Sequence, residues 1–411
     1  MTKNTFIFQT GHGKRLAKAE IESLGGKILD DVMDGFLVEL DPENTLHKNP
    51  TQLQRRMGGI VRVAEVVQSG PAAMPLNFEE WSVRALEDYF KDKTGKFRFG
   101  ISTHPKSEKI LKKMLIGAKK TLKKSVGNLR FVNKDFQNLS SVQAWHEGLL
   151  KDNGIELQLF RSEEDRSPEY TAPEKWYLAR TIGIQNFESY SKRDYDRPAK
   201  SAKNGMFPPK LAQILINIAT EGQTIAVFDP FCGSGTVLQE AWLREHESIG
   251  SDLVEQMVED SKENLDWLKF QFKLEGAPPV VFQADATKLT ADQLPKDAFA
   301  IVTETWLGPA LQKPLSELER PKVQREIEAL YEDFFSNLAE VKKSRTSKDP
   351  FTIVFTAPYH RTGNERHFLP NLPDILKKYT KIIPLSDHER PSLFYERKGQ
   401  LVSREIWKVA I

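Results

Sequence analysis

The stretch that most constrains the fold is residues 227–240, where an apolar run leads through a glycine-rich turn into a helical pattern. The run 225–228 suits a buried parallel strand, and the turn after it contains Gly233 and Gly235. From Thr236 onward, apolar residues recur at helical spacing. A strand, a glycine turn and a helix form the first unit of a doubly wound α/β domain, whose ligand binds at the carboxyl end of that strand.

The glycine turn matches neither of two familiar phosphate-binding motifs. It lacks the Gly-Lys-Ser/Thr of a P-loop and the Gly-x-Gly-x-x-Gly spacing of a dinucleotide site. Because glycine has no Cβ, the turn allows the backbone to approach a ligand closely, although a purely structural turn is the alternative. The turn closely resembles motif I of S-adenosylmethionine-dependent methyltransferases, in the form found in amino-group RNA and DNA methylases, through Asp229-Pro230-Phe231-Cys232-Gly233-Ser234-Gly235-Thr236.

Composition narrows the class of protein further. A chain of 411 residues is long enough for two or three domains, and its net charge of +2 does not by itself predict a nucleic-acid partner. The first residues lack the apolar core of a signal peptide, and no apolar run approaches the length of a membrane span. Cys232 is the only cysteine, which agrees with a reducing cytoplasm, and no Cys/His spacing suggests a metal site. We expect a cytoplasmic protein without a metal.

The N-terminal segment, about 1–90, alternates short strand and helix patterns. Residues 5–8, 36–38 and 61–67 favour strands, and a helix is expected between the first two of them. Such an alternation predicts an α+β sandwich, possibly ferredoxin-like in topology. We find no catalytic pattern in this segment and expect an accessory domain.

A basic helix dominates the next segment, about 91–185. Residues 106–124 carry eight lysines and one acidic residue, Glu108, whereas the whole chain has a net charge of +2. A lysine face is often only solvated, but lysines concentrated in one helix can also neutralise phosphates and release counterions. The sequence therefore predicts an RNA-binding surface that includes Lys112, Lys113, Lys119, Lys120, Lys123, Lys124 and Arg130.

A polar and aromatic stretch, 186–204, follows and is expected to be a linker. Lys192 and Arg193 make it basic enough to contact a nucleic acid. A helix then begins at Pro209, because proline suits the first position of a helix. This helix precedes the glycine turn and is expected to close over the same crevice.

Several motifs together resemble the THUMP-domain tRNA guanosine N2-methyltransferases, the archaeal and eukaryotic position-10 enzymes. The similarity covers most of the chain and is strongest over 180–268; it includes Ser191-Lys192-Arg193-Asp194-Tyr195, Pro208-Pro209-Lys210-Leu211 and Gly250-Ser251-Asp252. The resemblance implies a ferredoxin-like domain (1–90), a THUMP RNA-binding domain (91–185), the linker (186–204) and a Rossmann-like methyltransferase domain (205–411) with a mixed seven-stranded sheet. It also implies tRNA as the partner, with a possible activator subunit.

The resemblance also suggests how S-adenosyl-L-methionine would be held. Asp252, at the end of the second strand, can accept hydrogen bonds from the ribose hydroxyls, although a helix-capping role is the alternative. Asp285 and Ala286, at the end of the third strand, would contact the adenine, and Asp229 would face the methionine part. The full set expected to bind the cofactor is Pro209, Asp229, Phe231, Gly233, Gly235, Thr236, Asp252, Asp285 and Ala286.

The fourth strand, 299–302, leads into the position where amino-methyltransferases carry Asp/Asn-Pro-Pro-aromatic. An exocyclic amine is a poor nucleophile, so an oxygen acceptor must orient it and an aromatic ring must hold the base out of its helix. In this chain Glu304 would replace the acceptor and Trp306 the ring. We therefore expect methylation of a base amine in RNA, with guanine N2 in tRNA favoured.

This motif departs from the family pattern, because both prolines are missing and glutamate is one methylene longer. Two alternatives therefore stay open: a catalytically altered RNA-binding relative, and a DNA amino-methyltransferase. The rest of the chain is expected to supply a helix over 321–343, a fifth strand over 351–355 with a surface loop over 357–361, and a terminal hairpin.

Overall fold

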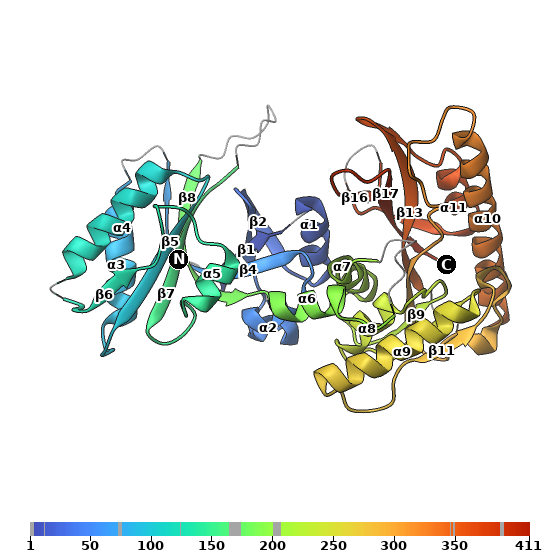
Figure 1. The fold of residues 1–411 in the computed structure, drawn as a ribbon, viewed down its shortest axis with the longest axis horizontal. Helices are drawn as coiled ribbons and strands as arrows, with labels where there is room; N and C mark the ends of the chain where they lie inside the picture. Colours follow the sequence, from blue (N-terminus) through green and yellow to red (C-terminus); the bar gives the residue numbers. More distant parts are fainter. Residues whose placement is uncertain are drawn as a thin grey trace. The chain divides into compact units, whose positions relative to one another are not determined.

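The computed structural model describes residues 4–11, 13–72, 76–123, 125–163, 174–199, 207–345, 347, 350–386 and 390–411. The chain divides into two compact units, Met1–Phe187 and Glu188–Ile411 (Figure 1). Each unit is built on its own sheet. Among the described residues, no helix is both long and apolar enough to cross a membrane.

The first unit contains an eight-stranded sheet in the order β2-β3-β1-β4-β8-β7-β5-β6. Its strands are β1 (Thr5–Thr10), β2 (Lys27–Val32), β3 (Gly35–Glu39), β4 (Ile60–Pro71), β5 (Phe97–His104), β6 (Leu129–Phe131), β7 (Gly154–Arg161) and β8 (Lys175–Ile184). The antiparallel pair β4–β8 joins the segment expected as 1–90 to the segment expected as 91–185. The two segments therefore share one sheet.

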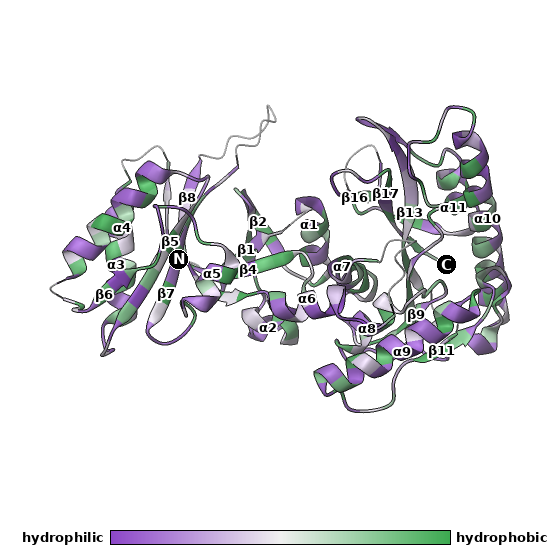
Figure 2. Cartoon of the chain, viewed as in Figure 1, coloured by the Kyte–Doolittle hydropathy of each residue, from purple (hydrophilic) through white to green (hydrophobic). Residues whose placement is uncertain are grey.

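The helices of this unit are α1 (Lys14–Ser23), α2 (Pro50–Arg56), α3 (Phe78–Phe90), α4 (Glu108–Leu122) and α5 (Ser141–His146). The helix α4 is the predicted lysine helix. Its apolar stripe, which includes Leu111, Met114 and Leu115, is buried, and the Ser107 side chain caps its first turn by accepting a hydrogen bond from the Ile110 N–H. The lysines remain on the outer face, seen as the hydrophilic colour along α4 in Figure 2.

The second unit is built on a nine-stranded sheet whose main path runs β11-β10-β9-β12-β13-β17-β15. The strands are β9 (Ala226–Asp229), β10 (Ser248–Asp252), β11 (Val280–Gln283), β12 (Phe299–Glu304), β13 (Thr352–Thr362), β14 (Glu365–His367), β15 (Lys381–Ile383), β16 (Leu393–Tyr395) and β17 (Val402–Ala410). Neighbours from β11 to β13 pair in parallel, whereas β17 is antiparallel to β13. The expected mixed seven-stranded, Rossmann-like sheet is confirmed, and β14 and β16 add to it.

Helices cover both faces of this sheet. The helices from the unit boundary onward are α6 (Phe187–Tyr195), α7 (Pro209–Thr220), α8 (Thr236–Trp242), α9 (Glu255–Phe272), α10 (Arg320–Ser344) and α11 (Leu372–Tyr379). In α10, buried residues such as Phe334 and Leu338 pack against Phe228, Ile301 and Phe355 of the sheet. Figure 1 shows α10 and α11 on one side of β13 and α7 on the other. The resulting core fixes the strand ends at which a site can form.

Two sequence predictions for this unit are wrong. The first half of the expected linker 186–204 is the helix α6, and residues 200–204 of it lie outside the described part of the chain. The surface loop expected over 357–361 is instead the continuation of β13, which runs to Thr362 because β17 pairs with it as far as His360. His360 is consequently buried, with 2% of its surface exposed.

Candidate active site at the carboxyl edge of the C-terminal sheet

The glycine turn lies at the switch point of the sheet. Beside β9 lie β10 on one side and β12 on the other, so the chain leaves the sheet in opposite directions there. In open α/β sheets, ligands bind outside the carboxyl ends of the strands at such a point. Gly233 and Gly235 have φ angles of +51° and +81°. A Cβ on Gly235 would lie 2.4 Å from the Ser261 Oγ, whereas a Cβ on Gly233 would meet nothing within 4 Å. Gly235 is therefore required by packing, and the backbone at Gly233 faces open space that a ligand can use.

Asp229, the last residue of β9, stabilises the glycine turn through hydrogen bonds of its side chain. Its Oδ1 accepts hydrogen bonds from the Phe231 N–H (3.1 Å) and the Thr303 hydroxyl (2.6 Å), and so connects β9 to the end of β12. Only 2% of its surface is exposed. Burial raises the pKa of Asp229 to about 7, and the neighbouring Asp252 and Glu304 carboxylates add to this effect. Burial thus favours the protonated form of this side chain.

Asp252, the last residue of β10, is bonded directly to the glycine turn. Its Oδ2 accepts a hydrogen bond from the Gly233 N–H (2.9 Å), and its Oδ1 accepts one from the Val254 N–H (3.0 Å). The side chain remains partly exposed. The carboxylate thus keeps acceptor capacity for ribose hydroxyls while it holds the turn, so both of the roles considered from the sequence are compatible with the geometry.

Asp285 follows β11 at the same edge, since the Ala284 N–H donates to the Asp252 carbonyl (3.0 Å). Its carboxylate, however, interacts with residues that follow it closely in the sequence. Oδ1 accepts from the N–H (2.9 Å) and hydroxyl (2.7 Å) of Thr287, and Oδ2 pairs with Lys288 at 3.0 Å. The hydrogen bond from the Thr287 hydroxyl lowers the pKa of Asp285. Ala286 turns its side chain into the core.

The remaining expected cofactor residues frame the turn. Pro209 is buried as the first residue of α7, and α7 contacts α8. Phe231 packs edge-on against Phe334, with ring centroids 5.2 Å apart. Thr236 begins α8, and its hydroxyl accepts a hydrogen bond from Arg197 (2.7 Å), a buried residue that the sequence analysis did not single out.

Arg193, which was expected to bind RNA, is instead buried and hydrogen bonded within the protein. Its guanidinium donates to the carboxylate of Glu240 and to the Ser189 hydroxyl, and 5% of its surface is exposed. The prediction for Arg193 is therefore wrong, because a buried, paired guanidinium cannot reach a phosphate. The signal in the sequence was the three-residue spacing of Tyr190 and Arg193, which α6 buries together. Lys192, next to it, is exposed.

Three consecutive side chains at the end of β12 are each held by a different element. Thr303 donates to Asp229 of β9, and Glu304 accepts from Arg404 of β17. Thr305 is hydrogen bonded to the Tyr331 hydroxyl of α10 and donates to the Thr356 carbonyl of β13 (3.0 Å). The segment that replaces Asp/Asn-Pro-Pro-aromatic is thus fixed by hydrogen bonds instead of by prolines.

Glu304 forms a two-point ion pair with Arg404. The Nε and Nη2 of Arg404 donate to the two carboxylate oxygens, the second at 3.3 Å. Burial raises the pKa of Glu304, and the positive charge of Arg404 opposes that rise. Sequence reasoning missed Arg404; the available signal was an arginine at a buried position within the expected terminal hairpin.

Trp306 lies in the loop that follows β12 and is 44% exposed. Gly308, two residues on, has a φ of +91°, and a Cβ there would lie 3.2 Å from Ile327 of α10. The loop therefore turns close to α10 at Gly308. An exposed indole two residues after Glu304 is available to stack on a flat ligand.

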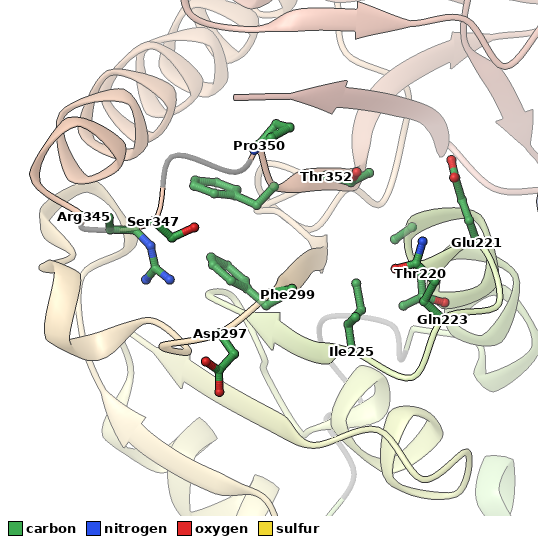
Figure 3. Close-up of a pocket in the computed structure, with 13 residues that line it drawn as sticks. Thr220, Glu221, Gln223, Ile225, Asp297, Phe299, Arg345, Ser347, Pro350 and Thr352 are labelled. Atoms are coloured by element: carbon green, nitrogen blue, oxygen red, sulfur yellow. The ribbon is translucent and has the colours of Figure 1, made fainter.

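The pocket in Figure 3 lies at the other end of the sheet. Its lining includes Ile225, Phe299 and Thr352, which lie at or just before the starts of β9, β12 and β13. The guanidinium of Arg345 donates to the carbonyls of residues 295 (2.7 Å) and 296 (2.9 Å). This pocket is separate from the glycine turn and does not belong to the candidate active site.

In the first unit, the expected RNA-binding cations are exposed: Lys112, Lys113, Lys119, Lys120, Lys123 and Arg130. Lys124 lies outside the described residues. Lys112 lies over the Phe136 ring and Lys119 over the Phe131 ring. Arg130 pairs with Glu147 at 3.3 Å, which reduces its share of the positive field.

Comparison with known proteins identifies the domain. Residues 197–349 match a family described as RMKL-like, methyltransferase domain, and residues 88–263 match one described as DNA methylase. This part of the C-terminal unit is therefore similar to methyltransferase domains. S-adenosylmethionine is accordingly its cofactor, as predicted, and the open backbone at Gly233 and the partly exposed Asp252 fit such a ligand.

Individual relatives are more distant. The chain is 29% identical over 173 residues to a tRNA (guanine(10)-N2)-dimethyltransferase of Methanothermobacter thermautotrophicus, covering 41% of this chain and 45% of that protein. It is 28% identical over 192 residues to the Pyrococcus abyssi protein of the same name, covering 47% and 54%. The matches thus span about half of each relative. The structure of TrmN from Thermus thermophilus aligns over 98% of this chain and 99% of its own, with 16% identity and a TM-score of 0.49.

Proposed function

We propose that this protein methylates an exocyclic base amine in RNA, most specifically guanine N2 in tRNA. The observation that carries the proposal is the position of Glu304. Ile301 of β12 pairs with Phe228 of β9, and Thr303 bonds Asp229, so Glu304, the last residue of β12, lies next to the strand that leads into the glycine turn. An amine acceptor there lies next to the backbone that faces the cofactor.

S-adenosylmethionine supplies an electrophilic methyl group on a sulfonium sulfur. The protein's task is to orient a weak nucleophile. The Glu304 carboxylate accepts a hydrogen bond from the amine and aims its nitrogen, and Trp306 stacks on the extruded base. Because Arg404, Thr303 and Thr305 fix this segment, the acceptor needs little reorganisation, which is the condition for orientation to accelerate a reaction.

The first unit is proposed to capture the RNA, as ferredoxin-like and THUMP domains. The exposed lysines of α4 support this role, because sequence-independent contacts to phosphates give salt-dependent affinity. The names of the two archaeal relatives support tRNA as the substrate. A tRNA-modifying role fits a cytoplasmic location.

A competition experiment tests the proposal. The protein is incubated with labelled S-adenosylmethionine and equal amounts of unmodified tRNA and double-stranded DNA. We expect label in the tRNA, none in the DNA, and loss of incorporation in a Glu304→Ala variant that still binds S-adenosylhomocysteine. Label in the DNA alone would refute the choice of RNA.

A DNA amino-methyltransferase is the second candidate, favoured by the match of residues 88–263 to a DNA methylase family. It predicts the opposite partition of label in the same tube. A catalytically altered binding protein is the third, since Arg404 contacts both oxygens of Glu304. That candidate predicts binding of tRNA and cofactor, with no label in either nucleic acid.

A further inference from the structure

Two histidines lie opposite each other where β13 extends past the end of β12. His360 of β13 pairs with His367 of β14 in antiparallel register, so both side chains lie on the same face of the sheet. The guanidinium of Arg320, the first residue of α10, donates a hydrogen bond to Nδ1 of His367. Burial lowers the pKa of His360 to about 4, and His367 and Arg320 add to this effect, so the three side chains form one cluster.

The hydrogen bond from Arg320 fixes the position of a proton in this cluster. Since arginine has only donors, Nδ1 of His367 accepts, and the proton of that ring is on Nε2. The exposed carboxylate of Glu365 lies 3.7 Å from this Nε2, which is too far for a hydrogen bond. His360 is 2% exposed, and neither of its ring nitrogens has a hydrogen-bond partner in the described part of the chain. Because buried polar groups are normally hydrogen bonded, these imidazole N–H donors are suited to a ligand with acceptors.

The charge of the cluster favours an anion as that ligand. Arg320 is positive, and no carboxylate among the described residues forms an ion pair with it. The adjacent Glu319 carboxylate accepts instead from the N–H (2.9 Å) and the hydroxyl (2.6 Å) of Ser316. A metal ion would compete with Arg320 for the Nδ1 lone pair of His367, and the described residues contain no group of three metal-ligating side chains. A phosphate has several acceptor oxygens and matches both guanidinium and imidazole donors.

The cluster lies beyond Glu304 at the carboxyl edge of the sheet. Glu304 pairs with Thr356 of β13, and His360 follows Thr356 by four residues. The side chains at these positions therefore share one face, at a separation of about 13 Å along the strand. This separation is comparable with the span of one nucleotide from its base edge to its phosphate. Arg320 and His367 are both partly exposed, so a phosphate can reach them.

We infer that Arg320, His360 and His367 form a binding site for a phosphate group, that of the nucleotide whose base amine is methylated. Arg320 and His367 contact the phosphate oxygens, and the buried His360 supplies a further N–H donor. This inference rests on the proposed function and goes beyond it by assigning a second attachment point for the target nucleotide, separate from the base and the cofactor.

Calorimetry with small ligands tests the site without methyl transfer. Protein saturated with S-adenosylhomocysteine is titrated with guanosine, with guanosine 5′-monophosphate, with guanosine 3′-monophosphate and with inorganic phosphate. We expect one of the monophosphates to bind at least tenfold more tightly than guanosine, the effect of a hydrogen bond to a charged group. Equal affinities, or binding of none of these ligands, would overturn the inference. Inorganic phosphate that binds as tightly as the nucleotide would show a site for free anions and would overturn the assignment to the target nucleotide.

The variant Arg320→Gln tests the charged member of the cluster. It should lower the preference for the monophosphate over guanosine about tenfold and leave the affinity for guanosine unchanged. The matched control is Arg366→Gln. Arg366 adjoins His367 in β14, but its side chain points to the opposite face and pairs with Glu396 at 2.7 Å, so this variant should keep the preference of the parent. Equal losses in both variants would show only a general effect of charge and refute the site.

The variant His360→Leu separates a binding role from a structural one. Leucine replaces a buried imidazole that has no hydrogen-bond partner in the described residues, so the Tm should equal or exceed that of the parent. The preference for the monophosphate should nevertheless fall about fivefold, the effect of one hydrogen bond. An unchanged preference, at any Tm, would remove His360 from the site.

Failure of the site and failure of the proposed function give different results. If the parent protein methylates no RNA, the proposed function fails, whatever the ligand titrations show. If the parent methylates guanine and Arg320→Gln keeps the full preference for the monophosphate, only the phosphate site fails.

Discussion

Replacing Arg193 by methionine tests whether this residue supports the fold or contacts RNA. The change removes the hydrogen bonds from Arg193 to Glu240 and to the Ser189 hydroxyl. Breaking a buried ion pair costs about 3–5 kcal/mol when the partner is left unpaired. Here Arg244 still pairs with Glu240 at 3.0 Å. We therefore expect a smaller loss of about 2–3 kcal/mol, set by the lost charged hydrogen bonds.

For a unit of this size, that loss corresponds to a fall in Tm of roughly 5–10 °C. Calorimetry of the full chain measures it, and the exposed neighbour Lys192 supplies the control, because Lys192→Met removes a positive charge without breaking a buried contact. Both variants are then titrated with tRNA below their unfolding temperatures. Arg193→Met should bind tRNA like the parent, and Lys192→Met should melt like it. An unchanged Tm with weakened tRNA binding in Arg193→Met would refute the structural role.

Three further predictions concern the glycine turn, the Asp229 side chain that is hydrogen bonded to it, and the lysine helix α4. Gly235→Ala should weaken S-adenosylhomocysteine binding at least tenfold in calorimetry, because the new Cβ meets Ser261 at 2.4 Å and the φ of +81° disfavours alanine; unchanged affinity would contradict the close packing. On folding, the pKa of Asp229 rises from 3.8 to about 7. The protonated side chain therefore stabilises the folded protein fully below about pH 4, by up to about 4 kcal/mol. This contribution to the free energy of unfolding is lost as pH rises to about 7. Asp229→Asn should therefore flatten the fall in urea stability between pH 5 and pH 8, and a parallel fall would count against the assignment. Lys119→Gln with Lys120→Gln should lower the slope of log affinity for tRNA against log salt by about 2, one per lost phosphate contact, with no change in Tm; an identical slope would remove α4 from the RNA surface.

Local patterns in the sequence predicted the elements that local forces determine. The apolar run before Asp229 and the periodic residues after Thr236 gave β9 and α8, because burial of a strand and of a helix stripe leaves distinct spacings. The lysine helix was equally clear, since its five buried residues recur at helical spacing. The parallel order of the sheet followed from the alternation of these elements.

Long-range pairs were not accessible in the same way. Arg193 and Glu240 are 47 residues apart, and Glu304 and Arg404 are 100 apart, so no local period reports either pair. The Arg193–Glu240 pair shows that Arg193 has a structural role where an RNA contact was predicted. The Glu304–Arg404 pair adds an interaction of the altered motif that was not predicted. The surface loop expected at 357–361 was wrong for the same reason, because its pairing with β17 depends on a distant strand.

Mass spectrometry of the nucleosides in modified tRNA tests whether the protein methylates guanine N2. Unmodified tRNA is incubated with the protein and S-adenosylmethionine, digested, and examined by mass spectrometry, with Glu304→Ala in parallel. We expect N2-methylated guanosine from the parent protein and none from the variant. Absence of any methylated nucleoside from the parent, although it binds the cofactor and tRNA, would contradict this expectation.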